Sequence, residues 1–91
     1  ISIRLGALGP SLSPVTACSI GNTSIGEAFN ASRNDDADIM FAGGAEAAIT
    51  NLSLASFGNA HVLSATNEDP AAASRPFDAD RDGFVMSEGA G

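Results

Sequence analysis

The spacing of hydrophobic positions predicts two elements in the first 36 residues. Residues 11–17 contain Leu12, Val15 and the β-branched Thr16, which favour a short strand. After residue 19 the apolar positions recur at the i, i+3, i+4 and i+7 spacing of one helix face. That face consists of Ile25, Ala28, Phe29 and Ser32. The turn formers at residues 34–36 predict the end of this helix.

The rest of the chain continues the alternation of strand and helix. Residues 37–42 form a short apolar run that two glycines end, which is typical of a buried strand. Asn51 is the predicted N-cap of a second helix that continues to about residue 59. Its inward-facing side chains are expected to be Leu52, Ala55 and Phe57. A polar loop over residues 64–82 and a strand beginning at residues 83–87 complete an α/β pattern, whose short apolar strands suit a sheet covered by helices on both faces.

Composition and charge exclude several classes of function. The chain has four Arg and no Lys against 11 acidic residues, for a net charge of −7. It cannot assemble the cationic face that nucleic acid requires, so we expect no nucleic-acid partner. No signal peptide is visible and no apolar run approaches the ~18 residues of a membrane span, so we expect no membrane association. A single cysteine forms no internal disulfide, which fits the reducing cytoplasm, or an organellar stroma or matrix in a eukaryote.

The ends of the chain do not look like those of a complete protein. Residue 1 is not Met, and residues 88–91 read as the middle of an element. We therefore expect residues 1–91 to be a partial domain that is incomplete at both ends.

Cys18 is the candidate nucleophile, because it lies at the predicted change from strand to helix. The first N–H groups of a helix lack intrahelical partners and carry partial positive charge. Such groups stabilise a thiolate and can bind the oxyanion that forms when a thiol attacks a carbonyl. Position alone leaves an equal alternative, in which Cys18 is a small buried hydrophobic residue.

Several sequence motifs decide between these alternatives. Residues 9–19 (GPSLSPVTACS) resemble the nucleophile segment of β-ketoacyl synthases, and residues 36–46 (DADIMFAGGAE) resemble a strand and turn of the same family. Residues 81–91 (RDGFVMSEGAG) resemble a third family motif, with Ser87 where Gly is usual. Shorter matches to the central loop of the family lie between residues 57 and 78. The resemblance covers almost the whole chain in one order and is greatest to bacterial type II elongating synthases and their organellar relatives.

The resemblance implies a fold, partners and a reaction. The fold would be the thiolase-like, layered αβαβα fold, with residues 1–91 in its N-terminal half, and the protein would be a homodimer. The partner would be acyl carrier protein bearing acyl and malonyl thioesters, with no cofactor and no metal. Such an acyltransferase loads an acyl group onto its cysteine, decarboxylates malonyl-carrier protein, and condenses the two into a β-ketoacyl product in fatty acid or polyketide synthesis.

The resemblance also assigns roles to single residues. Cys18 matches the nucleophile, and its own backbone N–H would be an oxyanion donor. Phe57 and Phe84 match positions that line or approach the acyl pocket, although either ring could simply be part of a core. The two catalytic histidines and the lysine of the family match no position in residues 1–91, so this fragment alone is expected to be inactive. His61, the only histidine, is expected to lie on the surface.

Other readings of the sequence are a polyketide ketosynthase domain, a thiolase or chalcone-type synthase, a papain-like hydrolase, and a calcium or interaction module. The acidic loop at residues 75–85 argues against the thiolase and chalcone-type enzymes, and the residues flanking Cys18 against the hydrolase. Asp78, Asp80 and Asp82 match the start of an EF-hand loop, but its twelfth position is Gly89 and not the required Glu. We expect these carboxylates to pair with Arg75 and Arg81 instead.

Overall fold

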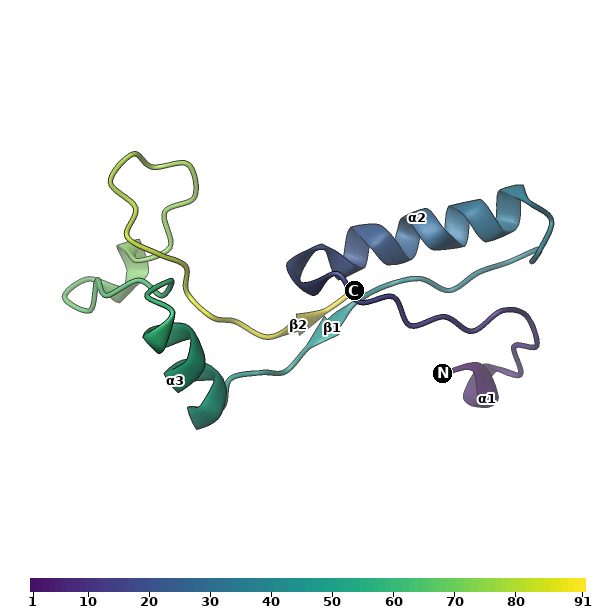
Figure 1. Cartoon of the computed structure of the whole chain (residues 1–91), viewed down its shortest axis with the longest axis horizontal. Helices are drawn as coiled ribbons and strands as arrows, with labels where there is room; N and C mark the ends of the chain where they lie inside the picture. The colour runs from purple at the N-terminus through teal and green to yellow at the C-terminus, as the bar shows by residue number, and fades with distance from the viewer. The chain divides into compact units, whose positions relative to one another are not determined.

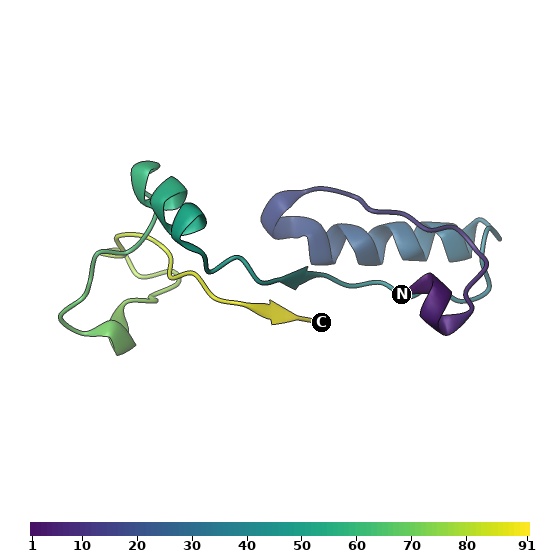
Figure 2. The same ribbon diagram turned by 90° about the horizontal axis from the view of Figure 1, so that it is seen from below.

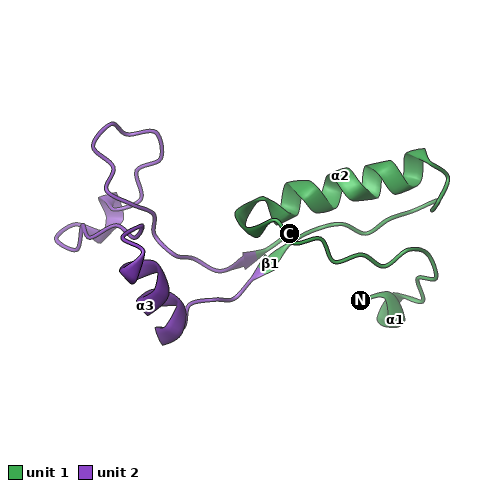
Figure 3. Ribbon diagram, in the orientation of Figure 1, with its two compact units in different colours: residues 1–45, 90–91 green, residues 46–89 purple.

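The computed structural model describes residues 1–91 and divides into two compact units (Figure 3). Residues 1–45 and 90–91 form the first unit, and residues 46–89 form the second. None of the helices has both the length and the hydropathy needed to cross a membrane. The elements, labelled in part in Figure 1, are α1 (Ser2–Leu5), η1 (Ala17–Ser19), α2 (Ile20–Arg33), β1 (Ala45–Glu46), α3 (Asn51–Asn59), η2 (Pro70–Ala72) and β2 (Gly89–Ala90).

Helix α2 is the main element of the first unit and confirms the first predicted helix. It ends where the Asn34 N–H donates to the carbonyl of Asn30 at 2.9 Å. Its small residues face the rest of the unit, and Ala31 is buried. Ile25 and Phe29 lie on the outer side and are 60% and 61% exposed. The Arg33 guanidinium lies 5.6 Å from the centre of the Phe29 ring, a cation–π contact that covers part of this apolar face.

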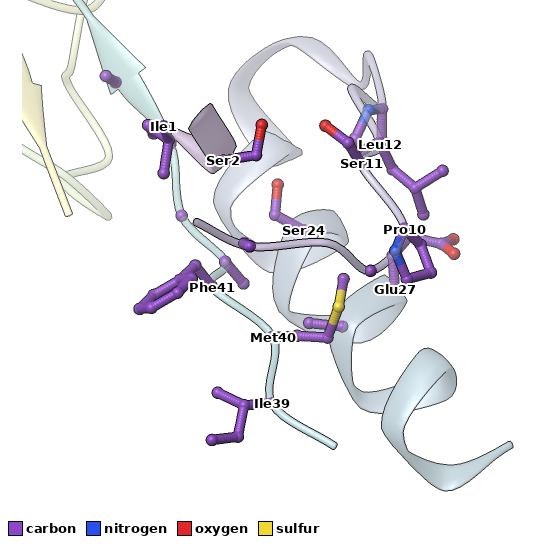
Figure 4. A pocket seen from close by; sticks show the side chains of 18 of the residues that line it. Ile1, Ser2, Pro10, Ser11, Leu12, Ser24, Glu27, Ile39, Met40 and Phe41 are labelled. Atoms are coloured by element: carbon purple, nitrogen blue, oxygen red, sulfur yellow. The ribbon is translucent and has the colours of Figure 1, made fainter. Parts of the chain in front are cut away.

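The predicted buried strand over residues 37–42 is wrong for this structure. The segment runs beside α2 (Figures 1 and 2), but it makes no strand hydrogen bonds. Its side chains nevertheless alternate as in a strand: Met40 points toward α2, whereas Ile39 and Phe41 point away and are 79% and 65% exposed (Figure 4). A strand needs a neighbour to bond its backbone and a layer to cover its outer face, and this segment has neither.

The predicted strand over residues 11–17 is also not formed. Residues 11–16 have no regular structure, and residues 17–19 belong to the turn η1. Pro10 and Pro14 have no N–H to donate to a ladder, and no other strand lies beside this segment. The segment is therefore irregular up to the start of η1.

Strand pairing occurs only near residue 45 and near the end of the chain. β1 and β2 form a two-stranded sheet, and the N–H groups of Gly44 and Gly91 each donate to the carbonyl of the other, at 2.9 and 3.0 Å. This exchange of two hydrogen bonds between opposite residues is the antiparallel pattern. The strand predicted at residues 83–87 is reduced to one isolated parallel bridge between Leu63 and Phe84.

Helix α3 confirms the second predicted helix, but its N-cap is Thr50 and not Asn51. Thr50 has extended backbone angles, and its hydroxyl accepts a hydrogen bond from the Ser53 N–H at 3.2 Å. The cap therefore lies one residue earlier than predicted. The expectation of an inward face is also wrong: α3 has no buried residue, Leu52 and Phe57 are 77% and 42% exposed, and Ala55 is exposed as well.

The chain contains both helix and sheet, in keeping with the α/β class, but these 91 residues do not form a layered αβαβα arrangement. The only buried hydrophobic residues are Ala31 and Ala73. Eighteen large hydrophobic side chains are exposed, from both units. No large hydrophobic side chain is fully removed from water.

We expect the 91-residue chain on its own to show no cooperative unfolding transition. Burial contributes about 25 cal/mol for each Å² of apolar surface, whereas ordering costs roughly 1–2 kcal/mol per residue. Because only two small alanines are buried, the free energy gained by apolar burial cannot offset the conformational entropy lost on ordering the chain. Far-UV circular dichroism in a urea titration should change gradually. A sigmoidal transition with a slope of about 1 kcal/mol/M would contradict this expectation.

Candidate functional site

Cys18 is an exposed free thiol in the turn η1, directly before helix α2. The chain enters this turn through Ala17, whose φ of 50° lies in the left-handed region. This conformation costs a non-glycine residue roughly 1–2 kcal/mol and turns the backbone sharply. The Ser19 N–H closes the turn by donating to the Thr16 carbonyl at 3.0 Å. The predicted position of Cys18 at the start of a helix is confirmed, without the preceding strand.

Two threonine hydroxyls brace this turn. The Thr23 hydroxyl donates to the Ser19 carbonyl at 3.1 Å, and Thr16 Oγ1 lies 2.7 Å from Thr23 Oγ1. Because a hydroxyl has only one proton to donate, Thr16 donates to Thr23. The residue that precedes the turn is thereby tied to the first turns of α2. The sequence analysis did not identify this pair, since Thr16 and Thr23 are brought together only by the turn itself.

The backbone around Cys18 keeps its positive partial charge. Ser19, the N-cap of α2, makes no capping hydrogen bond through its side chain. The Cys18 N–H donates no hydrogen bond in the structure. The Ile20 N–H, at the start of α2, is already paired with the Ala17 carbonyl, so the free donor beside the thiol is the N–H of Cys18 itself. The site therefore offers one free donor to a developing oxyanion.

The first unit also contains a groove of about 640 Å³ between residues 1–14, helix α2 and residues 39–45 (Figure 4). Gly44 lies so near the start of α2 that a Cβ there would come within 3.3 Å of Ile20 Cγ2. Cys18 does not line the groove. The groove is therefore not part of the candidate site.

Phe57 and Phe84, the two candidate pocket residues, contact each other in the second unit. Their ring centres are 5.4 Å apart at an interplanar angle of 79°, an edge-to-face contact. The Phe84 N–H donates to the Val62 carbonyl at 2.9 Å, and the Phe84 carbonyl accepts from the Ser64 N–H at 3.0 Å. Both rings remain about half exposed, at 42% and 44%. Each ring thus keeps a surface that another apolar group can cover.

The loop that carries Phe84 is held by Asp82, whose hydrogen bonds to residues 64–66 the sequence analysis did not predict. Its carboxylate accepts hydrogen bonds from the Ser64 hydroxyl at 2.7 Å, the Ala65 N–H at 2.8 Å and the Thr66 hydroxyl at 3.2 Å. No local sequence pattern links residues 64–66 with residue 82, so only the structure shows this cluster.

The predicted pairing of the acidic loop with arginines is confirmed for one of the two arginines. Arg75 Nη2 lies 3.7 Å from Asp82 Oδ1, but Arg81 donates to the backbone carbonyl of Asp78 at 2.7 Å and to no carboxylate. The Asp78 carboxylate accepts from the Asp80 N–H at 2.7 Å. These carboxylates serve the loop backbone, and no group of three or more His, Cys, Asp or Glu residues is arranged to hold a metal ion. His61 is exposed, as expected.

Comparison with known proteins now decides the family. The model of the β-ketoacyl synthase N-terminal domain matches residues 1–91. The chain belongs to the β-ketoacyl synthase family. It is 57% identical over 90 residues to 3-oxoacyl-[acyl-carrier-protein] synthase 2 of Synechocystis, and 54% identical over 91 residues to the enzyme of the same name from Staphylococcus aureus.

These matches cover 99% and 100% of this β-ketoacyl synthase chain. The chain in turn spans 22% of the length of each relative. The family resemblance drawn from the motifs is thus confirmed along the whole sequence.

Asp82 has a perturbed acidity in this β-ketoacyl synthase segment. The pKa of Asp82 is held below its ordinary value of 3.8, first by the hydrogen bond from the Ser64 hydroxyl and then by that from the Ala65 N–H. Desolvation opposes these effects but does not cancel them. The folded loop therefore favours the ionised carboxylate.

A lowered pKa in the folded state contributes stability above the ordinary pKa of 3.8, and this stability is lost as pH falls through the lowered value. We expect the Asp82→Asn variant of the full-length protein to melt at a lower temperature than wild type at about pH 6. The difference in melting temperature should narrow as pH falls below 3.8 and through the lowered pKa of folded Asp82, where the side chain becomes a neutral acid that resembles Asn. Scanning calorimetry of both proteins across this range is the measurement. A difference that stays constant with pH would contradict the expectation.

Proposed function

We propose that residues 1–91 are part of a longer 3-oxoacyl-[acyl-carrier-protein] synthase with the layered thiolase-like fold, active in the cytoplasm or in an organellar stroma or matrix. The reaction is the decarboxylative Claisen condensation of an acyl thioester with malonyl-[acyl carrier protein]. The observation that carries this proposal is Cys18, exposed in the turn directly before α2 with its own backbone N–H unpaired. The names of the relatives support the same chemistry.

In the first half of the reaction, the Cys18 thiolate attacks the carbonyl carbon of the acyl thioester. The tetrahedral oxyanion accepts a hydrogen bond from the free N–H of Cys18. The bond from carbon to the sulfur of the carrier then breaks, and the carrier thiol leaves with the proton that Cys18 gave up. The product is a thioester on Cys18, which divides one difficult condensation into two easier steps.

In the second half, malonyl-carrier protein loses CO2, and the resulting carbanion attacks the acyl group on Cys18. The Cys18 thiolate is the leaving group, and the product is a β-ketoacyl-carrier protein two carbons longer than the acyl group. The histidines and the lysine that the family uses for decarboxylation match no residue of this chain. Residues 1–91 alone are therefore expected to be inactive.

Phe57 and Phe84 are proposed to form an aromatic wall of the acyl pocket. Their edge-to-face contact fixes both rings, while their half-exposed surfaces can cover the methylene groups of an acyl chain. A polyketide ketosynthase domain would use the same nucleophile chemistry. Assays with saturated acyl donors and with β-substituted donors separate these two uses.

Cys18→Ala in the full-length protein should abolish acyl-enzyme formation, by roughly 1000-fold or more, because the attacking sulfur is gone. Intact-protein mass spectrometry after incubation with an acyl-[acyl carrier protein] measures the added acyl mass. Asn30→Ala, an exposed change on the same helix α2, is the matched control and should acylate normally. Acylation of the alanine variant would show that Cys18 is not the nucleophile.

The full-length protein is also proposed to be a homodimer. Residues 11–16 expose Val15 and Leu12 (88% and 61%) on an unpaired stretch of backbone, which is suited to pairing with a second copy. Multi-angle light scattering should give the mass of two chains, and Val15→Asp should shift the protein toward monomer. A wild-type protein that is monomeric at micromolar concentration would contradict the homodimer.

A further inference from the structure

We propose that Asp82 is a positioning residue, whose carboxylate clamps two segments of the second unit together and thereby holds Phe84 edge-on against Phe57. The proposal rests on the proposed function only where it treats these rings as a wall of the acyl pocket. The clamp itself rests on contacts within residues 46–89.

The Asp82 carboxylate uses both of its oxygens. Oδ1 accepts from the Ser64 hydroxyl at 2.7 Å, and Oδ2 accepts from the Ala65 N–H at 2.8 Å and the Thr66 hydroxyl at 3.2 Å. Three consecutive residues of one segment are thereby tied to one residue of another. An Asn side chain at this position has one accepting oxygen in place of two and no charge, so the hydrogen bond that Asp82 accepts from the Ser64 hydroxyl would be lost or reversed in direction.

The clamp is connected to Phe84 by a single residue, Gly83, which is packed closely against the opposite segment. Gly83 approaches the opposite segment so closely that a Cβ there would lie 2.7 Å from the Leu63 carbonyl oxygen. Phe84 then bonds the same segment on both sides, through the carbonyl of Val62 and the N–H of Ser64. A displacement of Asp82 from residues 64–66 must therefore strain or break these bonds and move the Phe84 ring.

Arg75 supports the clamp from the other side of the loop. Its guanidinium donates to the carbonyls of Ala72 and Asp80 at 3.2 and 2.8 Å, and Nη2 lies 3.7 Å from Asp82 Oδ1. Asp80 supplies a matched control, because it lies in the same loop and carries the same charge. Its side chain accepts no hydrogen bond in the structure, unlike that of Asp82.

The position of Phe84 has a consequence for selectivity. A ring that is fixed against Phe57 presents a surface of one defined shape to an acyl chain. A ring that samples several positions presents a surface that can adapt to acyl chains of different lengths. Loosening the clamp should therefore alter the discrimination between acyl donors that reach the wall and donors too short to reach it. A single methylene group in an apolar pocket can change kcat/KM by roughly tenfold or more.

The test compares full-length wild type, Asp82→Asn and Asp80→Asn, each with 4-fluorophenylalanine incorporated at position 84. The fluorine resonance reports the surroundings of the ring without requiring catalysis. We expect the resonance to move or split in Asp82→Asn and to stay in place in Asp80→Asn. In proteins with the natural phenylalanine, Asp82→Asn should change the ratio of kcat/KM between long and short acyl donors by roughly tenfold, with acylation of Cys18 by a short donor retained.

An unchanged fluorine resonance and an unchanged donor ratio in a folded Asp82→Asn protein would overturn the proposal. If that variant does not fold, Ser64→Ala and Thr66→Val each remove a single donor. The resonance should then move more for Ser64→Ala, which loses the shorter hydrogen bond, and no movement in either variant would overturn the clamp. If wild type is not acylated at Cys18, the proposed function is rejected. The fluorine resonances of wild type and Asp82→Asn would still show whether Asp82 positions the Phe84 ring.

Discussion

Hydrogen bonds between residues that are close in sequence determine which elements of this chain form. Helices α2 and α3 satisfy their backbone internally, and Thr50 caps α3 from the adjacent position. Burial contributes little, because Ala31 and Ala73 are the only buried hydrophobic residues. An element that needs a distant partner or a covering layer therefore does not form unless such a partner lies within the same 91 residues. The two-residue strands β1 and β2 meet this condition, and the longer predicted strands do not.

The same constraint explains which parts of the fold could be predicted from sequence. The helical period of Ile25, Ala28 and Phe29 and the turn formers after residue 33 were sufficient for α2, since both signals act within one helix. The apolar run at residues 37–42 was correctly recognised as extended, as the alternation of Met40 with Ile39 and Phe41 shows. It was wrongly taken to be paired and buried, because pairing depends on a neighbour that the sequence of the strand does not specify.

The features of the candidate site that could be predicted are likewise those that depend only on residues close in sequence. The position of Cys18 could be read from sequence, because a turn followed by a helix is a local feature. The contact of Phe57 with Phe84 could not, although both residues were singled out, because it depends on a bridge between segments far apart in the chain. Asp82 was correctly expected to pair with an arginine, and Arg75 is its partner. Its hydrogen bonds to residues 64–66 could not be predicted, because they also join segments far apart in the chain.

Each candidate part of the site is held by its own polar contacts. Thr16 and Thr23 fix the turn that carries Cys18, and Asp82 fixes the loop that carries Phe84. Neither set of contacts includes a fully buried apolar side chain, so the stability that keeps each set ordered has to come from apolar burial elsewhere in the protein. Directional hydrogen bonds define the geometry of the nucleophile and of the aromatic wall, whereas apolar burial supplies stability without direction. A longer chain that covered the exposed faces would therefore add stability to these two arrangements without having to create either one.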